Sequence, residues 1–184
     1  IGSNNLSGEI PSEISNLSNL EYLKLYSNNL SGEIPSEIGN LTNLESLNLS
    51  YNNLSGEIPP EIGSLINLEN LNLDINELSG EIPSEIGNLS NLEYLNLFNN
   101  NLSGEIPDEI GNLNLHYYNG LDLRNNNLSG NIPISICYQG DNTPSLSNNQ
   151  LCPPYPNCLS ESNIGNQNVS DCTVPSCIDG SEVL

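Results

Sequence analysis

The stretch LSGEIPSEIGNL, from Leu30 to Leu41, recurs unchanged at Leu78–Leu89, and close copies begin at Leu6, Leu54 and Leu102. The glycine in its third position recurs at intervals of 24, 24, 24, 24 and 26 residues, as Gly8, Gly32, Gly56, Gly80, Gly104 and Gly130. A fixed period of this length is typical of a solenoid, in which each coil completes the core of its neighbours. The sequence therefore predicts a stack of similar coils.

The residues of one period predict the parts of one coil. In LESLNLSYNNL, Leu47 and Leu49 alternate with outward residues, which predicts a short strand, and stacked strands form a parallel sheet. GEIP predicts a short second strand that ends at the proline, which has no amide hydrogen to donate. SEIGNL predicts a 3₁₀ or short helical turn that returns Ile38 and Leu41 to the core. Its glycine indicates a left-handed or a tightly packed backbone, at Gly39, Gly63, Gly87 and Gly111.

One asparagine in each period follows the predicted strand. An amide both donates and accepts hydrogen bonds, so a stacked column of asparagines can satisfy the backbone of turns that lack regular pairing. Ligand contact is the alternative role. We predict the structural role for Asn4, Asn28, Asn52, Asn76, Asn100, Asn126 and Asn149.

The full period, LxxLxLxxNxL followed by SGEIPxEIGNL, resembles the plant-type leucine-rich repeat of plant receptor-kinase ectodomains, polygalacturonase-inhibiting proteins and some bacterial surface proteins. The resemblance covers residues 1–159. It implies an α/β solenoid, a right-handed superhelix with a parallel β-sheet on its concave side and second short strands and 3₁₀ or short helices on its convex side. It also implies that ligands bind to the concave sheet.

Both ends depart from the repeat. Residues 1–159 contain about five full repeats, a partial first repeat and a degenerate last one, with no N-terminal cap. The first coil should expose a flank, so we expect upstream sequence, a covering partner or end-to-end stacking. The flank consists of Leu6, Ile10, Ile14 and Leu17. Residues 160–184 are predicted to form a disulfide-linked cap or tail that continues into a further segment.

All five cysteines lie in the last 48 residues. Zinc binding is the alternative to disulfides, but there is no CxxC pair and the single histidine, His116, is far away in sequence. Alignment of the last coils favours a Cys137–Cys158 disulfide and, less firmly, Cys152–Cys172, which leaves Cys177 as the unpaired candidate. Disulfides indicate an oxidising compartment, so we expect a secreted or cell-surface protein, extracellular or periplasmic.

The charge balance limits the partners. Two basic and 23 acidic residues give a net charge of −21, which disfavours nucleic acid and anionic lipid, and no stretch is apolar enough to insert into a membrane. Many of the glutamates fall into three columns, headed by Glu9, Glu13 and Glu21. These columns indicate a solvated face, with calcium binding as the alternative.

The outward positions around the LxL segments form the candidate binding surface. They include the single phenylalanine, several tyrosines and both cations, and tyrosine and arginine are favoured at interfaces. Exposed aromatic residues also favour strands for structural reasons, which is the alternative. The candidate ligand-binding residues are Tyr22, Lys24, Tyr26, Asn48, Tyr51, Asn72, Asp74, Tyr94, Asn96, Phe98, Asp122 and Arg124.

An enzyme is the least favoured class of function. His116 lies in an irregular insertion with no nucleophile at a recognisable spacing, and the acidic pairs repeat too regularly to form one unique acid and base. We expect no cofactor and no metal site. The favoured function is an extracellular recognition module for a protein, peptide or glycan. The alternatives are a structural spacer or adhesion segment of a larger surface protein and, less favoured, ice binding or a calcium-loaded acidic scaffold.

Overall fold

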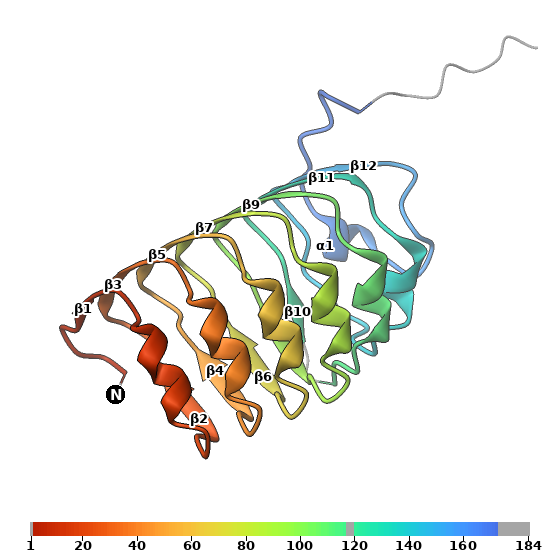
Figure 1. The fold of residues 1–184 in the computed structure, drawn as a ribbon. Helices are drawn as coiled ribbons and strands as arrows, with labels where there is room; N and C mark the ends of the chain where they lie inside the picture. The colour runs from red at the N-terminus through yellow and green to blue at the C-terminus, as the bar shows by residue number, and fades with distance from the viewer. Residues whose placement is uncertain (1, 117–119, 173–184) are drawn as a thin grey trace, which may run out of the picture.

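The computed structural model describes residues 2–116 and 120–172, which form a row of stacked coils (Figure 1). A complete coil contains one strand of a first sheet, one strand of a second sheet and one 3₁₀ helix. In Figure 1 the 3₁₀ helices lie side by side along one face, and the strands from β1 to β12 follow one edge. This architecture confirms the α/β solenoid predicted from the repeat.

The LxL segments form five parallel strands, which we call the concave sheet. Their order is β10-β8-β6-β4-β2, and the central leucines of neighbouring strands align, as Leu23 does with Leu47. These leucines point into the core. The strands are β2 (Tyr22–Lys24), β4 (Ser46–Asn48), β6 (Asn70–Asn72), β8 (Tyr94–Asn96) and β10 (Leu121–Asp122).

The second sheet has seven parallel strands, and they lie earlier in the repeat than predicted. In the second complete coil the strand spans Asn53–Gly56, so it ends before the glutamate of GEIP. Gly56 has a φ of +76°, a left-handed conformation that ends the extended backbone. The strands are β1 (Ser7–Gly8), β3 (Asn29–Gly32), β5 (Asn53–Gly56), β7 (Glu77–Gly80), β9 (Asn101–Gly104), β11 (Asn127–Asn131) and β12 (Gln150–Cys152).

Proline therefore starts the next element instead of ending the strand. Each 3₁₀ helix follows a proline in extended conformation, such as Pro59 with φ −65° and ψ 134°. The glycine of the helix allows close packing: a Cβ on Gly63 would lie 2.5 Å from the backbone oxygen of Glu85 in the next coil. The helices are η1 (Ser12–Asn16), η2 (Ser36–Asn40), η3 (Pro60–Ser64), η4 (Ser84–Asn88), η5 (Asp108–Asn112), η6 (Ile134–Cys137) and α1 (Glu161–Ile164).

The core is continuous from coil to coil, but its first coil is partly open. In the central coils the equivalent leucines are fully buried, as Leu41 and Leu65 are. Leu17, one coil earlier, is 51% exposed, and Leu6 is 38% exposed. Ile10, however, is only 5% exposed, so the expectation that it would face water is wrong. The neighbouring coil covers it.

The asparagine column is a buried hydrogen-bond ladder. The Oδ1 atom of Asn76 accepts from the Leu54 amide of the previous coil at 3.0 Å. Its Nδ2 atom donates to the Leu49 and Leu73 carbonyls at 3.1 Å each. The same pattern recurs from Asn52 to Asn149. The side chains replace backbone pairing where the chain passes between the two sheets.

The C-terminal segment closes the last coil. Gln167 extends the ladder: its Oε1 atom accepts from the Leu151 amide at 3.1 Å, and its Nε2 atom donates to the Leu146 carbonyl at 2.9 Å. Two disulfides, Cys137–Cys158 and Cys152–Cys172, fasten this end, and they are the pairs favoured by the sequence. Cys177 lies outside the described residues, as does the end of the predicted tail.

Candidate functional site

The register of the concave sheet arranges its outward residues in columns across the coils. One column, the strand-end column, aligns through direct strand pairing and consists of Lys24, Asn48, Asn72, Asn96 and Asp122. A second column, two residues further along each coil, consists of Tyr26, Ser50, Asp74, Phe98 and Arg124. We call it the variable column. Tyr22 and Tyr94 begin two of the strands, and Tyr51 lies in the turn after one strand.

The strand-end column is committed largely to the backbone. The Oδ1 atoms of Asn72 and Asn96 accept from the amides two residues later at 3.1 and 3.0 Å. Asp122 Oδ1 accepts from the Arg124 amide in the same way at 3.1 Å. Asn96 and Asp122 are also buried, at 7% and 6% exposed. The sequence predicted these side chains as ligand contacts, and in the structure their oxygens also shape the turn by accepting from its amides.

An aromatic and ionic cluster occupies the C-terminal end of the concave sheet. Arg124 donates to both carboxylate oxygens of Asp122, from Nε at 2.9 Å and from Nη2 at 2.5 Å. Its guanidinium also lies 5.2 Å from the centre of the Phe98 ring. The hydrogen bond to Asp122 raises the pKa of Arg124. The paired hydrogen bonds hold the guanidinium in place, and the side chain is 45% exposed. Ordered arginine and aromatic groups of this kind suit an interface anchor.

Aromatic residues also dominate the N-terminal end. Tyr22 donates a hydrogen bond to Glu45, which raises the pKa of the phenol, and Lys24 lies 5.6 Å from the centre of the Tyr22 ring. The backbone of Gly2 packs closely against Tyr26, since a Cβ added to Gly2 would lie only 2.4 Å from the ring. Tyr22 is 53% exposed and available to a partner, whereas Tyr26 is partly covered.

The centre of the sheet is polar. The Ser50 hydroxyl donates to Asn48 Oδ1 at 2.7 Å, and Asn96 Nδ2 donates to the Tyr94 hydroxyl at 3.1 Å. Asp74 is 8% exposed, and its Oδ1 atom has no hydrogen-bond partner. Burial raises the pKa of the Asp74 carboxyl. Hydrogen bonding by Ser50, Asn96 and Asn72 opposes the rise, and the charge of Asp122 adds to it.

The turn after each concave strand has a left-handed residue. Its φ is 54° at Tyr51, 52° at Ile75 and 54° at Asn99. Asparagine tolerates this conformation, but tyrosine and especially β-branched isoleucine do not, at a cost of order 1 kcal/mol. Tyr51 is nevertheless 53% exposed, so its ring adds little core packing in return. The sequence did not reveal this strain, because it depends on backbone conformation.

The repeats themselves distinguish positions that the fold fixes from positions that it leaves free. The second strand reads NLSG in β3, β5 and β9 and ELSG in β7. The variable column, in contrast, holds five different residues in five coils. A loop position on the way into the concave sheet also varies, as Thr42, Ile66, Ser90 and Asn114. The fold therefore accepts many side chains at the variable column.

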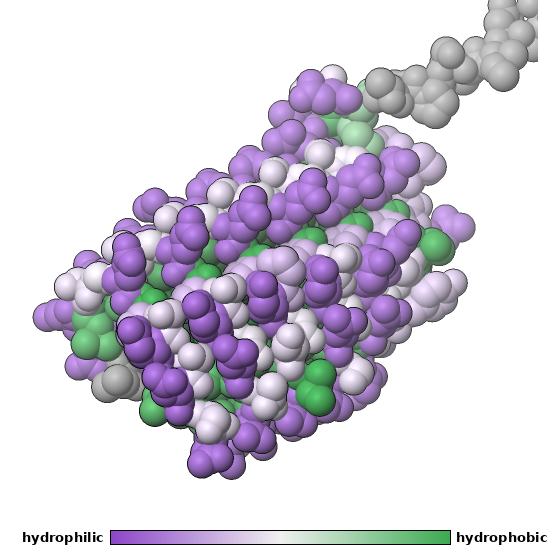
Figure 2. Space-filling view, viewed as in Figure 1, coloured by the Kyte–Doolittle hydropathy of each residue, from purple (hydrophilic) through white to green (hydrophobic). Residues whose placement is uncertain are grey.

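The opposite side of the coils is regular and polar. Figure 2 shows the face with the 3₁₀ helices, where hydrophilic residues form rows across the coils. One glutamate column packs against the glycines that end the second strands: Glu33 Cγ would lie 2.8 Å from a Cβ on Gly56. Within residues 2–116 and 120–172 no group of three histidine, cysteine or acidic side chains could hold a metal ion.

A second asparagine ladder, which the sequence reasoning missed, lies on the edge leading into the concave sheet. Asn43 donates to the Ser18 carbonyl at 2.8 Å, and Asn67 and Asn91 repeat the contact. The signal was present in the sequence, because these asparagines share the 24-residue period. The ladder fixes the approach of the chain to each concave strand.

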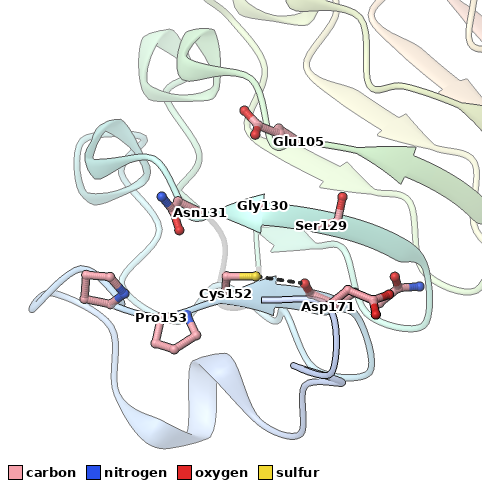
Figure 3. Close-up of a pocket in the computed structure, with 9 residues that line it drawn as sticks. Glu105, Ser129, Gly130, Asn131, Cys152, Pro153 and Asp171 are labelled. Atoms are coloured by element: carbon pink, nitrogen blue, oxygen red, sulfur yellow. Dashed lines mark hydrogen bonds between the residues drawn. The ribbon is translucent and has the colours of Figure 1, made fainter. Parts of the chain in front are cut away.

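A hollow of about 550 Å³ lies at the C-terminal end of the second sheet (Figure 3). It contains two carboxylates, Glu105 and Asp171, and no basic side chain. The sulfur of Cys152 lies 3.8 Å from the Gln150 carbonyl oxygen. The lining residues are Glu105, Ser129, Gly130, Asn131, Gln150, Cys152, Pro153, Pro154 and Asp171. This set offers no acid, base and nucleophile in a catalytic arrangement, so the concave sheet remains the candidate site.

Two family models match the sequence. A leucine-rich repeat region model matches residues 3–114, and a leucine-rich repeat model matches residues 119–138. None of the curated protein sequences compared with the chain matches it significantly. In the part of the chain that the structure describes, no helix is long and apolar enough to cross a bilayer.

Solved structures show close similarity. The ectodomain of the Arabidopsis thaliana receptor kinase GASSHO1/SCHENGEN3, in complex with CASPARIAN STRIP INTEGRITY FACTOR 2, is 47% identical with a TM-score of 0.77, over 80% of this chain and 18% of that one. The plant peptide hormone receptor RGFR1, in complex with RGF2, is 37% identical with a TM-score of 0.78, over 82% and 24%. A plant ice-binding protein is 36% identical with a TM-score of 0.74, over 82% and 49%. The chain thus spans less than half the length of each of these proteins.

Proposed function

Because this chain belongs to the leucine-rich repeat family, we propose that it is a non-enzymatic extracellular recognition module that binds a peptide or protein on its concave sheet. The observation that supports the proposal most is the variable column. Its residues differ from coil to coil while the second strand remains nearly constant. A surface that the fold leaves free is where a specific ligand can be recognised.

The composition of the concave sheet supports a peptide or protein ligand. Exposed Tyr22 and Tyr51 and the Phe98–Arg124 pair provide rigid aromatic and guanidinium anchors, which are enriched among residues that dominate binding energy. Two of the similar structures are receptors in complex with named ligands. The two disulfides fit an oxidising, extracellular compartment.

The test exchanges residues between coils, so that each substitution introduces a residue which the fold already accepts at that position. The concave-swap variant contains Tyr22→Ser, Tyr51→Asn and Phe98→Ser. The new residues are those at the equivalent positions of other coils, Ser46, Asn99 and Ser50. The matched convex-swap variant contains Pro60→Ser, Glu77→Asn and Asp108→Ser, after Ser36, Asn53 and Ser84. Both variants should keep the melting temperature of the wild type to within a few degrees.

The probe is a displayed library of random dodecapeptides, selected on the immobilised wild-type protein. We expect the concave-swap variant to bind the selected peptides at least about 30-fold more weakly, because it removes several anchors, and the convex-swap variant to bind as the wild type does. Equal binding by the two variants would contradict the proposal. It would favour a structural spacer or adhesion segment of a larger surface protein.

Ice binding is a second candidate, located on the second sheet. This sheet repeats one small hydroxyl residue in successive strands, as Ser31, Ser55, Ser79 and Ser103, and a plant ice-binding protein is among the similar structures. We propose inhibition of ice recrystallisation as the test. If this function is present, Ser79→Tyr should abolish it and the concave-swap variant should retain it. A wild-type protein without inhibition would exclude this candidate.

A further inference from the structure

Asp74 lies at the centre of the candidate site. It follows β6, the middle strand of the concave sheet, and stands between Ser50 and Phe98 in the variable column. Its backbone is fully engaged, since its amide donates to Asn72 at 3.1 Å and its carbonyl accepts from the Tyr51 amide at 2.9 Å. Its side chain, in contrast, is 8% exposed with an unpartnered Oδ1 atom.

The neighbouring polar groups compensate Asp74 only in part, because hydrogen bonding by Ser50, Asn96 and Asn72 lowers the pKa of its carboxyl without cancelling the rise that burial causes. The Ser50 hydroxyl donates to Asn48, and Asn96 Nδ2 donates to Tyr94. The basic side chains in the described part of the chain do not neutralise Asp74 either. Arg124 pairs with Asp122, and Lys24 lies over Tyr22 at the other end of the sheet. The central carboxylate therefore lacks a positive counterpart.

The fold does not need a carboxylate at this position. The same column holds tyrosine, serine, phenylalanine and arginine in the other coils, and the surrounding backbone geometry is retained. A buried carboxylate with an unpartnered oxygen and no cation beside it is costly, because it has lost water without full compensation. A group that costs stability and that the fold can replace is a candidate for recognition.

We propose that Asp74 binds a cationic side chain, a lysine ammonium or an arginine guanidinium, of the peptide on the concave sheet. This inference rests on the proposed function. The negative charge of Asp74 is shared by both carboxylate oxygens, so the cation can bind without contacting the buried Oδ1 atom. Phe98 is the next residue in the variable column and already faces one guanidinium, that of Arg124, at 5.2 Å, and the charge of Asp74 acts on nearby Tyr94. An arriving cation would gain the carboxylate together with aromatic contacts.

The test uses pairs of dodecapeptides derived from those selected on the wild type. Each peptide with a lysine or arginine has a neutral counterpart containing norleucine or citrulline. Binding is measured in 0.15 M salt to the wild type, Asp74→Asn and Asp74→Ser, and to Glu85→Gln as a control. Glu85→Gln removes one negative charge from exposed Glu85 in η4, on the opposite side of the coils.

We expect the wild type to bind a cationic peptide about 30-fold more tightly than its neutral counterpart. Both Asp74 variants should lose this preference, and Glu85→Gln should keep it. The two Asp74 variants should also melt at or above the wild-type temperature, since the fold does not use the carboxylate.

Two results would overturn the inference while leaving the proposed function intact. One is a wild type that binds peptides at the concave sheet without preferring a cation, or Asp74 variants that keep the preference. The other is a clear loss of stability in both Asp74 variants, which would make the carboxylate structural. A wild type that selects no peptides would instead overturn the proposed function, and the inference with it.

Discussion

The concave sheet and the second sheet are built by the same coils, yet they use sequence differently. The second strands repeat Asn-Leu-Ser-Gly with almost no change, whereas the concave strands read YLK, SLN, NLN and YLN. Both sheets pair in parallel, and every strand except β1 (Ser7–Gly8) buries one leucine. The difference indicates that the constant residues build the solenoid and that the fold does not fix the variable ones.

The largest expected effect comes from breaking the ladder that lies between the two sheets. Asn76→Ala would leave the buried Leu54 amide without a partner, and it would remove one of the two asparagine hydrogen bonds that each of the Leu49 and Leu73 carbonyls accepts. We expect the free energy of unfolding to fall by about 3 kcal/mol. Asn53→Ala, at the exposed start of β5, should change it by less than about 0.5 kcal/mol. Urea denaturation measures both, and equal effects would refute a special role for the ladder.

Close packing of the 3₁₀ helices comes next. Gly63→Ala would place a Cβ 2.5 Å from the Glu85 backbone oxygen, so neighbouring coils would have to separate. We expect a loss of about 2 kcal/mol, with Ser64→Ala as the control on the exposed side of the same helix. Thermal unfolding provides the measurement. Unchanged melting of Gly63→Ala would show that the coils are more loosely packed than the structure indicates.

A smaller effect of opposite sign is expected beside the concave sheet. Ile75→Asn would relieve the left-handed strain and should raise the free energy of unfolding by about 1 kcal/mol. The reciprocal change, Asn99→Ile, should lower it by a similar amount. If the two substitutions shift stability in the same direction, the strain argument is wrong.

The pH dependence of Asp74 should give a still smaller signal. Its pKa in the fold lies above the ordinary 3.8, so between these values the folded state binds more protons than the unfolded state, and stability falls as pH rises through this interval. Asp74→Asn removes this loss. Its stability advantage over the wild type should be fully present at neutral pH and disappear below about pH 3.8.

The comparison with Asp74→Asn is needed because the two proteins share every other titratable group. Denaturant melts of the two proteins at matched pH values separate the contributions. An advantage that does not vary with pH would rule out titration of Asp74 as its source.

No effect at all is expected from calcium. The glutamate columns repel along the stack, but the described residues contain no acidic group of three that could hold an ion. Melting temperatures in calcium and in chelator at fixed ionic strength should therefore coincide. A clear rise with calcium would revive the acidic scaffold hypothesis.

The sequence predicted the fold well because one period determines most of it. Leucine alternation and the 24-residue spacing predict the stacked coils, and the structural role favoured for the asparagine column is the one that the buried ladder shows. The second strand was predicted too late in the repeat because the left-handed glycine, and not the proline, ends it. Gly56 illustrates this, since its φ of +76° cannot be read from the letter sequence.

The candidate site was harder to predict. The outward positions were identified by alternation, but alternation does not show which outward side chains become buried. Asn96 and Asp122 face the same side as Phe98 and Arg124, yet their oxygens bind the backbone. The unpartnered Oδ1 atom of Asp74 depends on neighbours in adjacent coils, and the strain of Tyr51 depends on its backbone conformation, so a single repeat reveals neither.

Photo-crosslinking tests the central claim most directly. A dodecapeptide selected on the wild type would carry a benzophenone group, and the crosslinked residues would be mapped by mass spectrometry. Our account predicts crosslinks in residues 22–27, 46–51, 70–75 and 94–99, on the concave side. Crosslinks confined to the second strands, at residues 29–32, 53–56, 77–80 and 101–104, would contradict it.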